Sequence, residues 1–430
     1  MNDEELRNAV DVVGAHYISF ATDAARKLAD EYGKELWFSE ASPPMSYSEG
    51  TCRYDETKSG LSGINGVLDI ANRFIAMYPC GGMTLCEYQP AIAAYYDGVT
   101  FCHKQLITAN SPWSGYFHLE SGFFMQLHFS RFFKKGWAFI DNACYCDAKE
   151  GGDGHALVGA VYSYMTAADL KTGDYGTVIV NTTDKDIRYD FTVSNLAKAP
   201  SRVYVWETRG PENDKANYDE NYFKLRESVV PTGSGDGAYG FSVTVKPSSI
   251  ITVSTVDISF DGEYFKNPDK RENNVLELPY RDDYRYGKFG ADYLPSRGYA
   301  PRYTTDIGGA FEVRTDGSGN NYLCQIITEE LRAEEWGWTP DPVTNFGDDR
   351  WSDYSVSADV RLDERGGADN YVGIGLRYNL ASEGQSGYWI RVCADGCRQR
   401  KTLSRRIGIA DKPAEAWTIR ISRFGLHGRK

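Results

Sequence analysis

The segment GKELWFSE occupies residues 33–40 and contains a helix stop, a short apolar strand and a terminal carboxylate. Gly33 is the residue type that ends helices in the left-handed conformation, and Thr22 is a good N-terminal cap for the helix before it. The pattern predicts a helix over residues 22–32, followed by a strand that ends on Glu40.

Segments with the same alternation of strand and helix flank residues 33–40. Residues 9–16 (AVDVVGAH) and 83–88 (MTLCEY) are short apolar runs suited to buried strands. Apolar residues recur at three- and four-residue spacing over residues 64–78, which predicts a helix with one buried face, and a Phe-rich helix is predicted over residues 123–133. Strands and helices in alternation are typical of parallel α/β folds.

After residue 133 the helical periodicity stops, and short alternating segments separated by turn residues take over. Seven strands are predicted, the number of a β-sandwich, at residues 156–162, 176–181, 188–193, 202–207, 222–227, 241–246 and 250–256. A second all-β segment follows, with strands predicted at residues 311–314, 322–328, 354–362, 371–378, 388–393 and 417–421. Residues 259–309 are poor in aliphatic side chains and rich in charges, tyrosines and glycines, which is typical of a linker. The predicted domains are therefore residues 1–133, 134–258 and 310–430.

Composition excludes several classes of function. The chain has 430 residues with 47 Lys and Arg against 60 Asp and Glu, a formal net charge of −13. An acidic total disfavours a nucleic-acid partner, because phosphate binding needs a dense basic face. No apolar run of about 18 residues is present, so no membrane span is predicted. The acidic first residues do not have the basic start and apolar stretch of an export signal.

No motif in the sequence predicts a cofactor or a metal. Gly235, Gly237 and Gly240 match the GxGxxG pattern, but a strand pattern follows where a dinucleotide site needs a helix, so a turn is predicted. The six histidines include no HExxH pair, and the nine cysteines include no paired CxxC set. Cysteines clustered between residues 80 and 146 are consistent with one or two disulfide bridges in an exported protein, or with small buried side chains otherwise.

Polar and aromatic groups close three consecutive predicted strands. His16 closes the first strand, Glu40 the second, and Glu87 and Tyr88 the third. In (β/α) barrels, active sites lie at the carboxyl ends of the strands, so these groups are candidates for one site. A solvent-exposed acid at a strand end is the alternative interpretation of Glu40.

At these residues the chain resembles glycoside hydrolase family 59, the galactosylceramidase family. The matching stretches are DVVGAHY (11–17), GKELWFSE (33–40), AAYYDGVTF (93–101), SPWSGYFHLESGFF (111–124) and HFSRFFKKGW (128–137). The agreement runs in order over about the first 135 residues and continues more weakly through both β segments. The WSGxxxxES string from Trp113 to Ser121 is the most specific piece.

The resemblance implies the C-terminal part of a (β/α)8 TIM barrel, then a β-sandwich, then a lectin-like, concanavalin-like β jelly-roll domain. It implies a retaining mechanism, in which one carboxylate attacks the anomeric carbon and a second protonates the leaving oxygen. Glu40 matches the family's nucleophile at the end of the seventh barrel strand, and His16 matches the end of the sixth. The acid/base of the family belongs to an Asn-Glu pair, and none precedes Glu40. The expectation is therefore a chain that starts about two thirds of the way through the barrel.

The resemblance also suggests residues that contact the sugar. Besides His16, the counterparts of the family's sugar-binding groups are Ser42, Tyr88, Phe101 and, from the sandwich, Arg188. Trp113 and Glu120 are expected to pack between the barrel and the sandwich.

Three functional hypotheses follow. The first is a retaining β-galactosidase acting on galactosylceramide or a related β-galactoside, present as a fragment without its acid/base. The second is a non-catalytic carbohydrate-binding protein, whose C-terminal β-domain binds glycan through Trp336, Trp338, Trp351 and Trp389. The third is a related sphingolipid glycosidase specific for glucose. A lipid-presenting partner is a further expectation, and a secreted or lysosome-like compartment is expected for full-length members of the family.

Overall fold

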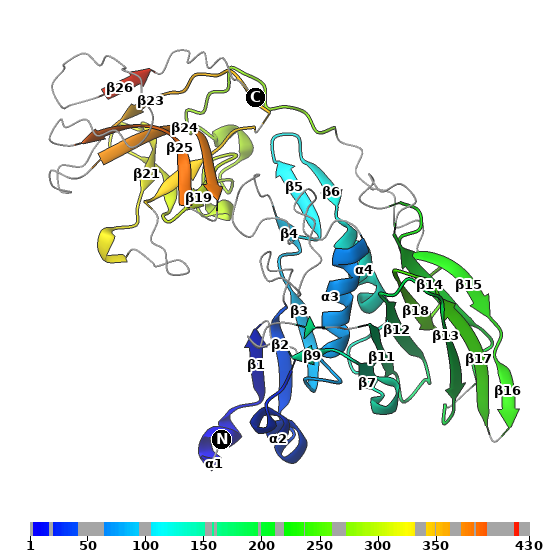
Figure 1. Ribbon diagram of the computed structural model, residues 1–430. Helices are drawn as coiled ribbons and strands as arrows, with labels where there is room; N and C mark the ends of the chain where they lie inside the picture. The colour runs from blue at the N-terminus through cyan, green and yellow to red at the C-terminus, as the bar shows by residue number, and fades with distance from the viewer. Residues whose placement is uncertain are drawn as a thin grey trace. The chain divides into compact units, whose positions relative to one another are not determined.

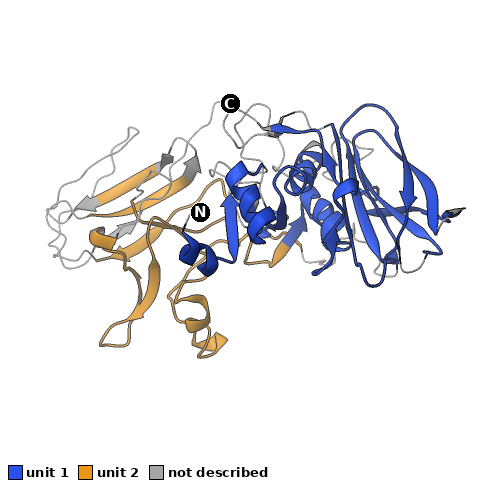
Figure 2. Cartoon of the chain, turned by 90° about the horizontal axis from the view of Figure 1, so that it is seen from below, with its two compact units in different colours: residues 1–95, 101–110, 117–270 blue, residues 96–100, 111–116, 271–430 orange. Residues whose placement is uncertain are grey.

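The computed structural model describes residues 3–16, 20–41, 64–93, 105–150, 157–158, 161–196, 199–210, 219–235, 237–259, 272–331, 341–348, 350–361, 371–381, 384–393 and 417–420 (Figure 1). The chain divides into two compact units (Figure 2). Unit 1 comprises residues 1–95, 101–110 and 117–270, and unit 2 comprises residues 96–100, 111–116 and 271–430. The boundary predicted at residue 133 lies inside unit 1, and most of the predicted linker belongs to unit 2.

Unit 1 begins with a parallel sheet in the order β1-β2-β3. Its strands are β1 (Val12–His16), β2 (Glu35–Ala41) and β3 (Met83–Tyr88), and the first helices are α1 (Glu4–Ala9), α2 (Asp23–Tyr32) and α3 (Ile64–Ala76). Thr22 caps α2 by accepting a hydrogen bond from the Ala25 amide, and Gly33 ends α2 with φ 63°. Apart from the short α1, these elements confirm the strands and helices predicted up to residue 88.

The helices α3 and α4 (Ser121–Ser130) lie in the interior of unit 1. They pack against each other and against the β-rich part of the unit (Figure 1). Phe74 of α3 meets Phe129 of α4 edge to face, with ring centroids 5.2 Å apart. Three short strands not predicted from the sequence form a sheet in the order β4-β5-β6: β4 (Ile92–Ala93), β5 (Ile107–Ser111) and β6 (Tyr116–Leu119).

Two antiparallel sheets form the β-rich part of unit 1. The larger sheet has the order β15-β14-β18-β12-β11-β7, with β8 also paired to β11, and the smaller has the order β13-β17-β16. The strands are β7 (Ala138–Phe139), β8 (Tyr145–Cys146), β11 (Tyr162–Ala168), β12 (Tyr175–Asn181), β13 (Ile187–Val193), β14 (Val203–Arg209), β15 (Lys224–Val229), β16 (Thr232–Gly235), β17 (Ala238–Val245) and β18 (Ser249–Ser254), beside the separate pair β9 (Lys149–Glu150) and β10 (Leu157–Val158).

The larger sheet is covered on both faces. One face contributes Val178, Val180 and Ile250 to the core shared with α3 and α4, and the other contributes Ile179 and Ile251 to the core between the two sheets. Every residue of β12 and β18 is therefore buried, whereas β13 alternates because its outer face meets solvent. A continuous apolar run is what a strand buried on both faces requires.

Two predictions about this region have different outcomes. The strand predicted over residues 156–162 contains β10 at Leu157–Val158, and its residues 156, 159 and 160 lie outside the described residues, whereas most of the seven-residue strand β11 at Tyr162–Ala168 was missed. The signal was weak because β11 (YSYMTAA) contains Ala and Met where strands favour β-branched residues. The turn predicted at the GxGxxG pattern is confirmed, because Gly237 lies between the hairpin strands β16 and β17 with φ 74°.

Unit 2 consists of antiparallel strand pairs and short 3-10 turns. Its pairs are β19 (Thr305–Ile307) with β22 (Val343–Asn345), β20 (Phe311–Thr315) with β21 (Asn321–Gln325), β23 (Ser357–Val360) with β26 (Trp417–Arg420), and β24 (Tyr371–Ala381) with β25 (Gly384–Cys393). Aromatic residues pack the segment before β19, as predicted, for example Phe289 stacked on Tyr293 at 4.7 Å. A lectin-like jelly roll remains a prediction for this unit.

Among the helices of the described ranges, none combines the length and apolarity needed to cross a lipid bilayer.

Candidate active site

The three parallel strands bring their last residues to one edge of the sheet. His16 is the register partner of Glu40, and Ala41 is the partner of Tyr88. Irregular register at Ala15/His16 and between Phe38 and Ala41 shows that the ladders bend at this edge. The prediction that His16, Glu40 and Tyr88 lie along a common carboxyl-terminal edge is confirmed by this register.

His16 and Glu40 are in direct contact. Nδ1 of His16 lies 3.1 Å from Oε2 of Glu40, and the side chains are 59% and 22% exposed, respectively. With its proton on Nδ1, the imidazole donates a hydrogen bond to the carboxylate, which holds one of the two carboxylate oxygens in place and leaves the other for a second interaction. The Glu40 carboxylate is thus oriented yet accessible, as a nucleophile must be.

The residues of β2 that precede Glu40 hold it in place because they are buried in the core of unit 1. Leu36 and Phe38 are 3% and 1% exposed and belong to the core of unit 1. Ser39 lies against Gly14 of β1 so closely that a Cβ at Gly14 would come within 2.6 Å of the Ser39 Oγ. Glycine at position 14 therefore lets β1 and β2 approach each other one residue before the candidate carboxylate.

Tyr88 is positioned by the helix layer. Its ring meets Phe74 of α3 edge to face at 6.1 Å, and Phe74 in turn contacts Phe129 of α4. Tyr88 is half-buried and packs against the core of unit 1. An aromatic group held in this way can pack on the apolar face of a sugar ring.

The other predicted sugar contacts have different positions in the structure. Ser42 and Phe101 lie outside the described residues. Arg188 is on β13, where it is 68% exposed, pairs with Asp190 at 2.9 Å and donates to the Ser242 hydroxyl at 2.9 Å. These contacts hold Arg188 on the outer face of the smaller sheet, and its role toward a sugar stays a prediction.

A second polar cluster surrounds Glu120 at the start of α4. Glu120 is 2% exposed and accepts a hydrogen bond from the Thr108 hydroxyl at 2.5 Å, while Nε2 of His118 lies 2.9 Å from the same carboxylate. Gln105 donates to Thr108 at 2.6 Å. Sequence reasoning expected Glu120 to pack but did not foresee this cluster, because its members come from segments with no common periodicity. A buried carboxylate with these donors ties β5 and β6 to α4.

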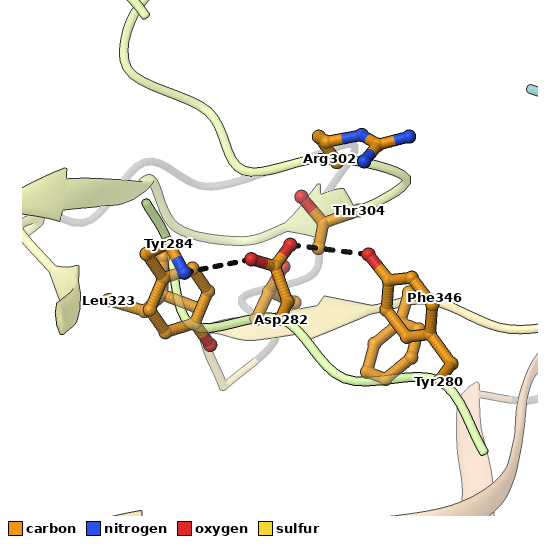
Figure 3. Close-up of a pocket in the computed structure, with 8 residues that line it drawn as sticks. Tyr280, Asp282, Tyr284, Arg302, Thr304, Leu323 and Phe346 are labelled. Carbon is orange, nitrogen blue, oxygen red and sulfur yellow. Dashed lines mark hydrogen bonds between the residues drawn. The ribbon is translucent and has the colours of Figure 1, made fainter. Parts of the chain in front are cut away.

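Unit 2 contains a pocket of about 110 Å³ (Figure 3). The residues that line it are Tyr280, Asp282, Tyr284, Arg302, Thr304, Leu323, Thr344 and Phe346. The Asp282 carboxylate accepts hydrogen bonds from the Tyr280 hydroxyl at 3.2 Å, the Tyr286 hydroxyl at 2.5 Å and the Tyr284 amide at 2.8 Å. The buried Thr344 hydroxyl has no hydrogen-bond partner within the described structure. Aromatic faces and polar groups thus share one small cavity.

In the part of the chain that the structure describes, no cluster of three or more His, Cys, Asp or Glu side chains could hold a metal ion.

Comparison with known proteins shows what the segment that contains the parallel sheet and its acidic edge is similar to. Residues 1–131 match the family model of Glycosyl hydrolase family 59, so the resemblance to this family of glycoside hydrolases is confirmed. Most of the chain is similar to galactocerebrosidases in particular. It is 26% identical to galactocerebrosidase of Salmo salar over 372 residues, covering 84% of this chain and 49% of that protein. It is 24% identical to galactocerebrosidase of Homo sapiens over 371 residues, covering 84% and 48%.

The chain thus spans about half the length of the curated relatives it matches. Among solved structures, it is similar to a GH30 endoxylanase from Clostridium papyrosolvens, with 14% identity, a TM-score of 0.37, and coverage of 59% of this chain and 50% of that one.

Proposed function

We propose that this chain is part of a retaining β-galactosidase that acts on galactosylceramide or a related β-galactoside, with Glu40 as the nucleophile. The contact between Glu40 and His16 at the carboxyl-terminal edge of the parallel sheet carries the proposal. It lies in the segment that matches the family model and has the chemistry that an attacking carboxylate needs.

The proposed reaction proceeds through a covalent ester. A Glu40 carboxylate oxygen forms a bond to the anomeric carbon while the bond from that carbon to the leaving oxygen breaks, and water later hydrolyses the glycosyl ester. His16 keeps one Glu40 oxygen hydrogen-bonded, so the other is directed at the sugar. Tyr88 packs against the ring, and its support by Phe74 limits its movement.

Residues 1–40 contain no Asn-Glu pair, which is the pair that supplies the acid/base in the family, so no acid/base is assigned to them. General acid catalysis is worth about 10² to 10⁴-fold when the leaving group is an alkoxide. We therefore propose that these 430 residues alone are slow on galactosylceramide and faster on substrates whose leaving group departs without a proton. Robust turnover of galactosylceramide by this chain would contradict that part of the proposal.

Covalent trapping tests the nucleophile without requiring an acid. The chain is incubated with 2,4-dinitrophenyl 2-deoxy-2-fluoro-β-galactoside, whose dinitrophenolate leaves unaided, and labelled peptides are sequenced by mass spectrometry. The label is expected on Glu40 and is expected to be absent in Glu40→Gln. Glu87→Gln is the matched control, since Glu87 is an exposed acid near the end of the neighbouring strand β3. Label on another residue, or undiminished labelling of Glu40→Gln, would refute the assignment.

The same reagent with a glucose ring tests the sugar specificity. Galactose and glucose differ in the orientation of one hydroxyl, and a site that hydrogen-bonds that hydroxyl discriminates strongly between them. Faster labelling by the galactoside is expected. Faster labelling by the glucoside would favour the glucose-specific alternative.

Carbohydrate binding by unit 2 is a second candidate function, favoured by the pocket of Figure 3. Tyr280 and Phe346 offer aromatic faces, and Thr344 offers a hydroxyl that has no hydrogen-bond partner among the described residues. Trp351 and Trp389, which the sequence suggested, make contacts within the unit, and their role toward a glycan stays a prediction. Trp351 donates to the Leu276 carbonyl at 2.8 Å and Trp389 meets Tyr378 edge to face at 5.7 Å, while Trp336 and Trp338 lie outside the described residues.

Calorimetric titration of galactose separates the two candidates. Binding that persists in Glu40→Gln and is lost in Phe346→Ala would place the sugar in unit 2. Binding lost in Glu40→Gln and kept in Phe346→Ala would place it at the parallel sheet. Phe346 is 46% exposed, so its truncation is expected to leave the fold intact.

A further inference from the structure

The end of helix α3 lies close to strand β8, and each of these two segments has a cysteine. Cys80 lies in the turn after α3, and Cys146 is the last residue of β8. The two side chains are hydrogen-bonded to each other. Both residues are partly buried and belong to unit 1.

Several independent contacts hold the two segments together. Tyr78, two residues before Cys80, donates a hydrogen bond to Asp141 at 2.5 Å, and its ring stacks on Phe139 at 4.2 Å. Ser163 of β11 is the register partner of Cys146, and its hydroxyl donates to Asn72 of α3. The approach of Cys80 to Cys146 is therefore built into the packing of the unit.

The backbone around each cysteine is also fixed. The Cys80 amide donates to Ala76 at 2.9 Å, and the Cys80 carbonyl accepts from the Arg26 guanidinium. After Cys146, the Asp147 carboxylate accepts from the amides of Val161 and Tyr162 at 2.8 and 3.0 Å. A disulfide needs Cα atoms about 4.4 to 6.8 Å apart, so the fixed backbone on both sides decides whether the two hydrogen-bonded side chains can be joined.

The neighbouring cysteines are engaged differently. The Cys144 thiol exchanges hydrogen bonds with the backbone of Thr166 at 3.4 and 3.5 Å, and burial raises its pKa to about 11. Burial likewise raises the pKa of Cys86. The pKa of Cys80 is lowered instead, first by the hydrogen bond from Cys146 and also by the positive charge of Arg26. Cys80 therefore has the more available thiolate, which is the attacking form in disulfide exchange.

We propose that Cys80 and Cys146 are a redox modification site: a low-molecular-weight disulfide oxidises them to a Cys80–Cys146 disulfide that ties the end of α3 to β8. The Cys80 thiolate attacks one sulfur of the small disulfide, forms a mixed disulfide and releases one small thiolate. The Cys146 thiolate then attacks the Cys80 sulfur and releases the second. The two protons of the cysteines pass to the two released thiolates, and the small disulfide gains the two electrons.

The oxidised site would brace the helix that supports Tyr88. α3 carries Phe74, which packs on Tyr88, and β3 begins just after Cys80. In the chain-entropy account a disulfide that closes a long loop restricts the unfolded state more than a short one. The oxidised chain is thus expected to melt about 5 to 15 °C above the reduced chain.

Glutathione titration of the full 430-residue chain tests the proposal. The chain is equilibrated at different ratios of oxidised to reduced glutathione, free thiols are alkylated, and peptides are mapped by mass spectrometry. A linked pair of peptides containing Cys80 and Cys146 is expected to grow with the oxidised fraction. It should vanish in Cys80→Ser and in Cys146→Ser and persist in Cys86→Ser and Cys144→Ser. In Cys146→Ser, Cys80 is expected to accumulate as a mixed disulfide with glutathione.

Two results would overturn the proposal. One is a folded chain in which Cys80 and Cys146 remain separately alkylated at every glutathione ratio. The other is a linked peptide that survives Cys146→Ser or disappears in Cys144→Ser, which would assign the bond to Cys144. If a serine variant fails to fold, the wild-type chain is treated with dibromobimane, which fluoresces when it bridges two neighbouring thiols. A bridge between Cys80 and Cys146 supports the site, and a bridge elsewhere opposes it.

Discussion

The Thr208 hydroxyl of β14 lies 2.8 Å from Nε2 of His128 in the last turn of α4. On the other side of the ring, Nδ1 lies 2.8 Å from the Thr252 hydroxyl of β18, which itself donates to the His128 carbonyl at 3.2 Å. Thr208 also accepts a hydrogen bond from the Phe223 amide at 2.8 Å. This network joins the last helix of the α/β part to the large sheet within unit 1.

The network specifies the protonation of His128. Because Thr252 donates to a carbonyl, its oxygen accepts from Nδ1–H, and Nε2 then accepts the proton of the Thr208 hydroxyl. A second proton on the ring would leave the Thr208 hydroxyl hydrogen without a partner. Consistent with this, burial lowers the pKa of His128 to about 3.

Replacing His128 by Leu is expected to lower the free energy of unfolding by about 2 to 4 kcal/mol, because two buried hydroxyls lose their partner. Urea unfolding followed by tryptophan fluorescence measures the change. Thr208→Val should lower the free energy of unfolding by less than His128→Leu does. Thr208→Ser keeps the hydroxyl and should lower it least. Equal stability of His128→Leu and wild type would mean that the network contributes nothing.

Stability is also expected to fall as the pH drops below about 6.5, the pKa of an unperturbed histidine. Below that pH the unfolded chain binds a proton at His128, whereas the folded chain does not bind it until pH 3 is approached. The loss attributable to His128 is at most about 1.4 kcal/mol per pH unit. Urea midpoints of wild type and His128→Gln between pH 7 and 4.5 should converge as the pH falls, and parallel curves would contradict the assignment.

Gly14→Ala is expected to destabilise the parallel sheet by about 1 to 3 kcal/mol, because the new Cβ would meet the Ser39 hydroxyl at 2.6 Å. The double variant Gly14→Ala/Ser39→Ala removes that oxygen and should recover part of the loss. Thermal unfolding of the two single variants and the double variant measures the coupling. Additive effects would show that the two side chains do not clash.

His16→Ala is expected to slow covalent labelling at Glu40 by roughly 10 to 100-fold, because the carboxylate loses a hydrogen bond worth about 1.5 to 3 kcal/mol. His16 acts by holding the Glu40 carboxylate in position. His16→Asn, which can donate to the same oxygen, should therefore restore part of the labelling rate. The readout is the pseudo-first-order rate of labelling at saturating reagent. Unchanged labelling in His16→Ala would show that the contact does not orient the nucleophile.

Local signals predicted the α/β elements well. The Thr22 cap, the Gly33 stop and the apolar face of α3 involve residues within a few positions of one another, and α2, β2 and α3 appear where those signals place them. The strands β4, β5 and β6 were missed because β4 has two residues and its parallel partner β5 is more than ten positions away. Such short strands depend on their partners for stability more than on their own propensity.

The candidate site was predictable in part. Parallel strands end at the same edge, so His16, Glu40 and Tyr88 could be grouped before any distance was known. The 3.1 Å contact between His16 and Glu40 depends on the register shift at Ala15/His16, which no local pattern encodes. The Glu120 cluster and the unit 2 pocket were not foreseen, because their members come from separate segments.

From its sequence alone this chain specifies where α2, β2 and α3 lie, which face of α3 is apolar, and that an acid stands near the end of β2. Caps, periodicity and turn residues act over a few positions, and so a linear pattern contains them. Tertiary structure alone determined that His128 binds two threonines of the large sheet and that Cys80 faces Cys146 across 66 positions of chain. Those pairings follow from close packing in a shared core, where the position of each side chain depends on every neighbour at once.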